Sequence, residues 1–287
     1  MINMVVIMDL EYIDLEYINK VYKKNVIIRD LATVAIFAFI PIFVFIPLLA
    51  MSGVIMSNII RFIFDIKCKA VKSVVLGGYV DTKLDIAFEK FGYSEDDEES
   101  KEIVKSLGII DVGTKINIRE CFYGYYRGVK FTQIGVDTQY VETDNYGITT
   151  ITDKFGGRLI IIEASLFDNE GIIKIMPHSD DSSLESEGFK KTTLNNEVDE
   201  YYDIYVSDEG LSLPEAFLNH IVEMARIYQK YTFNLKIEKD KIYMSIDNII
   251  PEAYNVKSIY RLSKKNMDSL IKKDSYFITN TISSILD

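Results

Sequence analysis

The sequence has no tryptophan and only two cysteines, two histidines and five prolines in 287 residues. Cys68 and Cys121 cannot build a disulfide framework and show no CxxC spacing, which favours a reducing compartment with two packed free thiols. Zinc centres usually need three or four His or Cys ligands, and catalytic triads need a histidine beside a nucleophile. With only His178 and His220 available, we predict neither a metal centre nor a cofactor.

Basic clusters are also missing. Only short pairs such as Lys190-Lys191 and Lys272-Lys273 occur, and the net charge is −11. Residues 1–74 carry eight Lys and Arg against six Asp and Glu, which leaves 24 against 37 for residues 75–287. Because so acidic a region repels phosphate backbones, we predict that the chain does not bind nucleic acid.

One long stretch lacks charge altogether, from Leu31 to Ile60. A soluble core helix rarely stays apolar on every face for more than about 18 residues, so this stretch predicts a membrane segment with the lipid bilayer as its partner. A cleavable signal peptide fits poorly, because about thirty residues precede the stretch. They include five acids: Asp9, Glu11, Asp14, Glu16 and Asp30.

The segment is too long for one upright span, since thirty helical residues rise about 45 Å against a hydrocarbon core of about 30 Å. A break at Pro47 gives two short helices, Leu31–Ile46 and Leu48–Phe64, and Met51–Gly53 offers another tip. Four basic residues flank each side of the stretch. We favour a hairpin with both ends in the cytoplasm, which satisfies the positive-inside rule on both flanks; a single span is the alternative.

The pentamer DLEYI, at residues 9–13 and again at 14–18, places Leu10, Ile13, Tyr17 and Val21 near one helical face. This spacing predicts an amphipathic helix beside the membrane. The expected organisation is a juxtamembrane helix at 1–30, the transmembrane segment at 31–64, a linker at 65–84 and an acidic cytoplasmic domain at 85–287.

The region after the linker predicts a mainly antiparallel sheet with packed helices. Residues 114–122 and 128–143 alternate apolar and polar side chains, as half-buried strands do. Residues 156–165 contain a nearly continuous apolar run that predicts a central strand, and 171–177 follow after a turn. An acidic first turn after Ser94 predicts a helix that ends near Gly108.

The last ninety residues carry clear local signals. Ser212-Leu213-Pro214-Glu215 has the form of a capping box, and apolar residues recur after it at helical spacing. Alternation on both sides of Glu238–Lys241 predicts a β-hairpin, and the C-terminal segment from Lys264 predicts a helix. Together the elements indicate an α+β fold.

This order of motifs resembles DUF3137, an uncharacterised family of bacterial proteins. The features that carry the resemblance are Phe155-Gly156-Gly157, the stretch from Val198 to Asp208, Pro214 at a helix start and the hairpin at 233–247, all within about residues 85–250. The resemblance implies a membrane-anchored protein with an α+β domain, and a LemA-like membrane protein as a partner. It implies no chemistry.

The acid-rich stretch at residues 196–210 is the first candidate site. Carboxylate oxygens suit Ca²⁺ or Mg²⁺, but an EF-hand glycine is missing, and alternation from Tyr202 to Ser207 indicates a strand with its acids in turns and on the wet face. We favour this structural interpretation. The six acids are Glu197, Asp199, Glu200, Asp203, Asp208 and Glu209.

Two further candidates are weaker. His220 and Glu223, one helical turn apart, predict a surface hydrogen bond in preference to half of a metal site. Phe155-Gly156-Gly157-Arg158 opens a strand, where we expect a tight turn in preference to an anion cradle, because neither glycine-rich nucleotide motif is present. His178 begins a Ser- and Asp-rich stretch that predicts an exposed loop.

No catalytic set is recognisable, so the catalytic residues stay unknown. The preferred function is a non-enzymatic protein-interaction or scaffold domain at the cytoplasmic membrane. The alternative is a membrane-tethered hydrolase or ligand sensor with a site built from scattered carboxylates.

Overall fold

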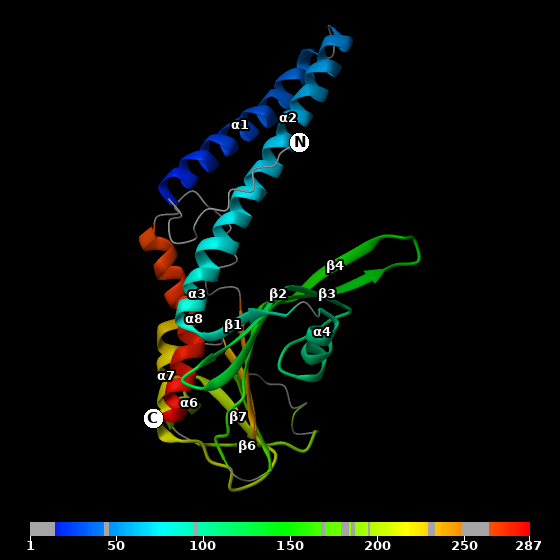
Figure 1. Ribbon diagram of the computed structural model, residues 1–287. Coiled ribbons are helices and arrows are strands. Elements are labelled where there is room, and N and C mark those ends of the chain that lie inside the picture. Colours follow the sequence, from blue (N-terminus) through cyan, green and yellow to red (C-terminus); the bar gives the residue numbers. More distant parts are fainter. Residues whose placement is uncertain are drawn as a thin grey trace. The chain divides into compact units, whose positions relative to one another are not determined.

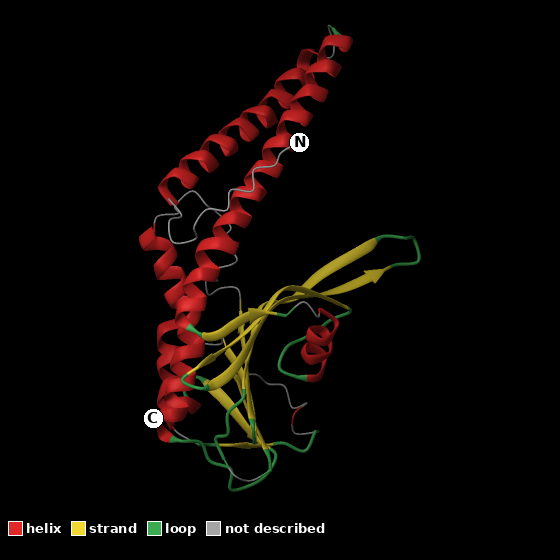
Figure 2. Ribbon diagram, viewed as in Figure 1, coloured by secondary structure: helices red, strands yellow, loops and turns green. Residues whose placement is uncertain are grey.

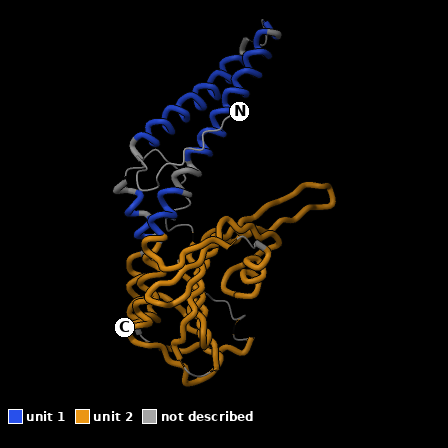
Figure 3. Tube along the Cα trace, in the orientation of Figure 1, with its two compact units in different colours: residues 1–84, 252–274 blue, residues 85–251, 275–287 orange. Residues whose placement is uncertain are grey.

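The computed structural model describes residues 15–42, 46–94, 97–167, 170–178, 184, 187–194, 196–228, 233–247 and 264–287. The chain divides into two compact units (Figure 3). The first contains residues 1–84 and 252–274, and the second contains residues 85–251 and 275–287.

The first unit is built on two long helices, α1 (Leu15–Ile42) and α2 (Pro47–Val74), packed as an antiparallel hairpin (Figure 2). The predicted break at Pro47 is confirmed, since α2 begins there. Gly53 allows close packing, because a Cβ at this position would lie 2.6 Å from the Phe39 ring. Among the described residues, one segment, Leu49–Val71, is long and apolar enough to cross a membrane.

The segments on both sides of the apolar stretch differ from the separate juxtamembrane helix and linker that the sequence predicts. The described part of the juxtamembrane helix continues without a break into the first apolar helix, and Leu10 and Ile13 lie outside the described residues. Residues 65–84, expected as a linker, are helical: α2 runs to Val74, followed by the π-helix η2 (Val75–Val80) and by α3 (Asp81–Ala87). Tyr79 donates a 2.6 Å hydrogen bond to Asp268 within the same unit.

The second unit contains one nine-stranded antiparallel sheet, which confirms the predicted fold class. Its order is β1-β2-β3-β4-β9-β8-β5-β7-β6. The strands are β1 (Glu89–Tyr93), β2 (Lys115–Tyr126), β3 (Val129–Thr143), β4 (Thr149–Ile162), β5 (Ile172–Pro177), β6 (Lys190–Thr192), β7 (Tyr202–Val206), β8 (Phe233–Glu238) and β9 (Lys241–Asp247).

Helices lie on both faces of the sheet (Figure 1). Val104 of α4 (Asp97–Ser106) and Leu107, which follows the helix, pack onto Ile134, Val136 and other residues on one face. α7 (Glu215–Tyr228) and the end of α8 (Lys264–Leu286) cover the other, where the Phe233 and Phe277 rings lie 5.3 Å apart. The short α6 (Asn196–Asp199) precedes β7.

The predicted helices and hairpin are confirmed in outline. The β8–β9 hairpin turns at Glu238–Lys241 as expected, and its apolar residues are buried. α7 begins at Glu215, directly after Pro214. The chain leaves α4 at Gly108, whose positive φ of 63° suits glycine.

We expect Ile246→Asp, on β9, to lower the free energy of unfolding by about 4 kcal/mol or more, since a charge would be buried without a partner. Phe233→Asp should behave alike. Thermal melting of the full chain in detergent measures the change. The control is Ile151→Asp, on β4, where the side chain is exposed and melting should stay near that of the unmodified protein. Unchanged melting of Ile246→Asp would mean that this face of the sheet is exposed.

Candidate functional site

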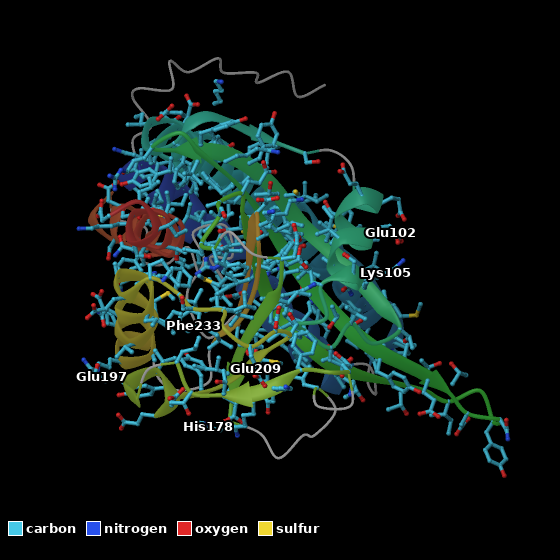
Figure 4. All side chains as sticks on the ribbon, turned by 90° about the horizontal axis from the view of Figure 1, so that it is seen from below. Glu102, Lys105, His178, Glu197, Glu209 and Phe233 are labelled. Atoms are coloured by element: carbon cyan, nitrogen blue, oxygen red, sulfur yellow. The ribbon has the colours of Figure 1, made fainter. Side chains whose placement is uncertain are left out.

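The six acids of the 196–210 stretch do not converge on one point. Glu197 lies beside α7, apart from Glu209, as Figure 4 shows. Glu197 accepts a 3.1 Å hydrogen bond from Arg226, and Glu209 accepts a 2.5 Å hydrogen bond from Lys190. Within the described part of the chain, no group of three or more His, Cys, Asp or Glu side chains is placed to hold a metal ion.

Asp203 corrects one expectation, that the acids of this strand lie on the wet face. β7 is paired on both sides, by β5 and β6, and all five of its residues are buried. Asp203 is only 5% exposed, on the face opposite to Tyr202 and Ile204. Two polar partners offset the cost of burying its carboxylate: the Lys191 Nζ cation lies 2.8 Å and His178 Nδ1 lies 2.7 Å from its Oδ1.

His178 bridges two acceptors. Its Nδ1 faces the Asp203 carboxylate, and its Nε2 lies 3.2 Å from the carbonyl oxygen of Glu200. An ionised carboxylate and a carbonyl can only accept hydrogen bonds, so both contacts are satisfied only when both ring nitrogens carry protons. The ring therefore ties the end of β5 to the turn before β7. The stretch that follows His178 up to 183 lies outside the described residues.

These groups line an open depression of about 610 Å³. Burial raises the pKa of Asp199 above its ordinary value, and a hydrogen bond from the Leu194 backbone partly offsets this. Burial also raises the pKa of Tyr202. The lining residues are His178, Lys191, Thr192, Thr193, Asp199, Tyr202, Asp203 and Ile204.

The other sequence candidates lie in the core. His220 is buried, and its Nε2 lies 3.0 Å from Thr281 Oγ1 on α8; the expected surface hydrogen bond to Glu223 is wrong, because Glu223 points to solvent. Phe155–Arg158 form no turn, since they lie within β4. A Cβ at Gly157 would lie 2.1 Å from the Ile246 carbonyl, and the buried Arg158 guanidinium lies 5.1 Å from the Phe277 ring. Both cysteines are buried and free, as predicted.

A second candidate surface did not emerge from the sequence. We call it the arm: the β3–β4 ribbon from Gln139 to Asp153, which projects from the rest of the sheet (Figure 1). β2 pairs with β3 only as far as Gln139, and β9 pairs with β4 only from Gly157 onward. Among the described residues, the arm therefore has no further strand on either edge.

The arm exposes large apolar side chains near its tip. Tyr146 is 91% exposed, Ile148 64% and Ile151 58%. The turn itself is well formed, because Asp144 accepts hydrogen bonds from the backbone N–H groups of Tyr146 and Ile148. The alternation of Val141, Ile148 and Ile151 with threonines was the available signal in the sequence, but it could not show that Ile148 and Ile151 are exposed.

Comparisons with known proteins give little. No family model matches the chain, and no curated protein matches it. A solved structure, the mycobacterial trehalose monomycolate transport factor A, TtfA, is similar over 65% of this chain and 84% of its own, with 8% identity and a TM-score of 0.32. The resemblance to DUF3137 stays a prediction.

One prediction concerns His220. Burial lowers its pKa from 6.5 to about 4. Because the unfolded chain then binds a proton that the folded domain does not, stability is complete above about pH 6.5 and falls by up to about 3 kcal/mol as the pH drops towards 4. His220→Gln retains a polar group near Thr281 but cannot bind this proton. We therefore expect its free energy of unfolding to lack this fall at low pH. Urea unfolding at pH 7 and pH 4.5 measures it; an identical pH dependence in both proteins would contradict the prediction.

Proposed function

We propose that the protein is a membrane-anchored, non-enzymatic interaction protein. The α1–α2 hairpin holds it at the cytoplasmic membrane, and its acidic α+β domain binds another protein through the arm. The observation that carries the proposal is the exposure of Tyr146, Ile148 and Ile151 on a ribbon that projects from the rest of the sheet. Exposed apolar clusters of this kind are typical of interaction sites.

The charge of the arm indicates what kind of partner it fits. Between Gln139 and Asp153 there are three acids, Glu142, Asp144 and Asp153, and no Lys or Arg. The cytoplasmic leaflet of a bacterial membrane is anionic and would repel this ribbon. A protein surface that presents Lys or Arg around an apolar patch complements it.

The edge of β4 that faces away from β3 supplies a second mode of contact. Residues 149–155 are extended, and on the side away from β3 no described strand pairs with them. An extended segment of the partner can add to this edge through backbone hydrogen bonds, with its alternate side chains contacting the apolar residues of the arm. The LemA-like partner implied by the family resemblance belongs to this proposal.

The alternative function, a hydrolase or ligand sensor, has one observation in its favour, the depression that contains His178 and Asp203. It is the weaker candidate because these groups are already engaged. Both ring nitrogens of His178 contact acceptors, and Asp203 contacts both the Lys191 cation and the His178 ring, so neither is poised to take a proton from a substrate.

The arm can be tested by cross-linking in cells. With a photoreactive benzophenone residue in place of Tyr146, we expect one discrete protein adduct, identified by mass spectrometry, whose yield falls as Glu142 and Asp144 are changed to Lys. The control places the same residue at Ile227, which is exposed on α7 and should give no such adduct. Equal adducts from both positions, or none from Tyr146, would argue against the arm as the docking surface.

Sidedness can be tested with the natural cysteines. If both ends of the hairpin lie in the cytoplasm, a membrane-impermeant maleimide should label neither Cys68 nor Cys121 in intact cells. Because both thiols are buried, lysis in mild denaturant is needed before the reagent labels both. The control for full labelling is a sample of lysed, denatured cells, in which no membrane separates the reagent from the protein. Labelling of Cys121 in intact cells exposed only to the mild denaturant would place the domain outside.

A further inference from the structure

The helical hairpin folds the uncharged stretch in half. Two contacts fix its register: Arg29 lies 3.9 Å from Asp65, and the Phe39 ring lies against Gly53. Each joins a residue of α1 to a residue of α2 across the connection at 43–46, one pair far from it in sequence and the other near it. Leu31 and Ile60, the ends of the uncharged stretch, therefore lie at the same end of the hairpin, and the connection lies at the other.

Each half is too short to cross a bilayer. About fifteen helical residues rise about 22 Å, whereas the hydrocarbon core is about 30 Å thick. Treating Leu49–Val71 as the span instead would place Arg61 near the bilayer centre and Asp65 well inside it. Charged side chains are costly at that depth, so the uncharged halves fit the membrane better.

The far end of the hairpin is its most apolar part. Residues 40–50 read IPIFVFIPLLA and include no polar side chain. A connection that emerged into water would be expected to carry turn residues such as Gly, Asn or Ser. The side chains of Ile40, Ile46 and Leu49 are exposed on the protein, which suits contact with acyl chains.

Two backbone features at the start of α2 suit this end of the hairpin to apolar surroundings. Pro47, the first residue of α2, has no N–H that would need a partner. The Ile46 carbonyl accepts a 3.0 Å hydrogen bond from the Ala50 N–H and closes the first turn of α2. Both features lower the cost of leaving a helix end in hydrocarbon.

The near end carries the charges. Asp65 contacts Arg29 and, at 3.0 Å, Lys69, while Arg29 also contacts Asp30 at 2.9 Å. With Thr33, Asn58, Arg61 and Phe62 they line an open depression of about 580 Å³. This ring of ion pairs suits the headgroup region, and only one end of the hairpin has such a ring.

We propose that the α1–α2 hairpin is a re-entrant anchor. It enters the bilayer from the side that holds both of its ends, and its tip stops among the acyl chains without reaching water on the far side. The inference rests on the membrane attachment in the proposed function but not on the arm or its partner. It differs from the hairpin of two full spans expected from the sequence, whose tip would reach the far side of the membrane.

Single cysteines in the full chain, with Cys68 and Cys121 changed to Ser, test the depth of the tip. In right-side-out and inside-out membrane vesicles, an impermeant maleimide should label Ile46→Cys in neither, and label it after detergent is added. Lys69→Cys, at the charged end, should react in one vesicle type only. Labelling of Ile46→Cys from the side opposite to Lys69→Cys would overturn the proposal. Absence of the protein from both membrane fractions would overturn the attachment itself.

Two further measurements do not depend on a negative result. A bimane fluorophore on Ile46→Cys should be quenched at least twofold more by lipids spin-labelled deep in the acyl chain than by headgroup-labelled lipids, and the reverse order would overturn the proposal. Ile46→Asp should reduce the fraction retained in membranes after alkaline extraction several-fold. The control is Ile66→Asp, at an exposed position of the same helix beside the charged end, which should not reduce the retained fraction. Equal retention of both variants would count against a buried tip.

Discussion

Burial of β4 on both of its faces is the constraint on which the rest of the second unit depends. Leu159 and Ile161 pack with α4 on one face, while Ile160 and Ile162 point to the other, and all four are buried. A strand without a wet face needs a layer on each side. The sheet therefore requires α4 on one face and α7 with the end of α8 on the other. Where these layers end, the same strand continues past Phe155 as the uncovered arm.

The elements that the sequence predicted well are those whose signals are local. The capping box before α7, the alternation in β8 and β9 and the proline that begins α2 depend on neighbours within a few residues. What the sequence could not predict depends on distant partners. His220 is satisfied by Thr281 and Arg158 contacts Phe277, more than sixty and one hundred residues away, so neither burial could be read from periodicity. Gly157 is likewise required by close packing against Ile246 of β9 and not by a turn.

The acid-rich stretch shows why residue type and spacing alone mislead about sites. Alternation correctly indicated a strand, but it placed Asp203 on a solvent-facing side. β6, which pairs with β7, has only three residues, and so short a strand leaves too weak a pattern to be predicted. The carboxylate is buried because Lys191 comes from that added strand and His178 from the end of β5. Removing either Lys191 or His178 would leave the buried carboxylate with one partner fewer, so the three residues act as one structural unit at the sheet edge.

The two parts of the chain differ in charge. The hairpin and its flanks are basic overall, whereas the remaining chain is strongly acidic. At an anionic leaflet the basic flanks are attracted and the acidic domain is repelled, both within about a Debye length of the surface. Under the proposed membrane attachment, the hairpin alone would hold the protein, and the acidic domain would gain nothing by lying on the lipid. The same repulsion would keep the acidic arm off the lipid and leave its apolar tip available to a protein partner.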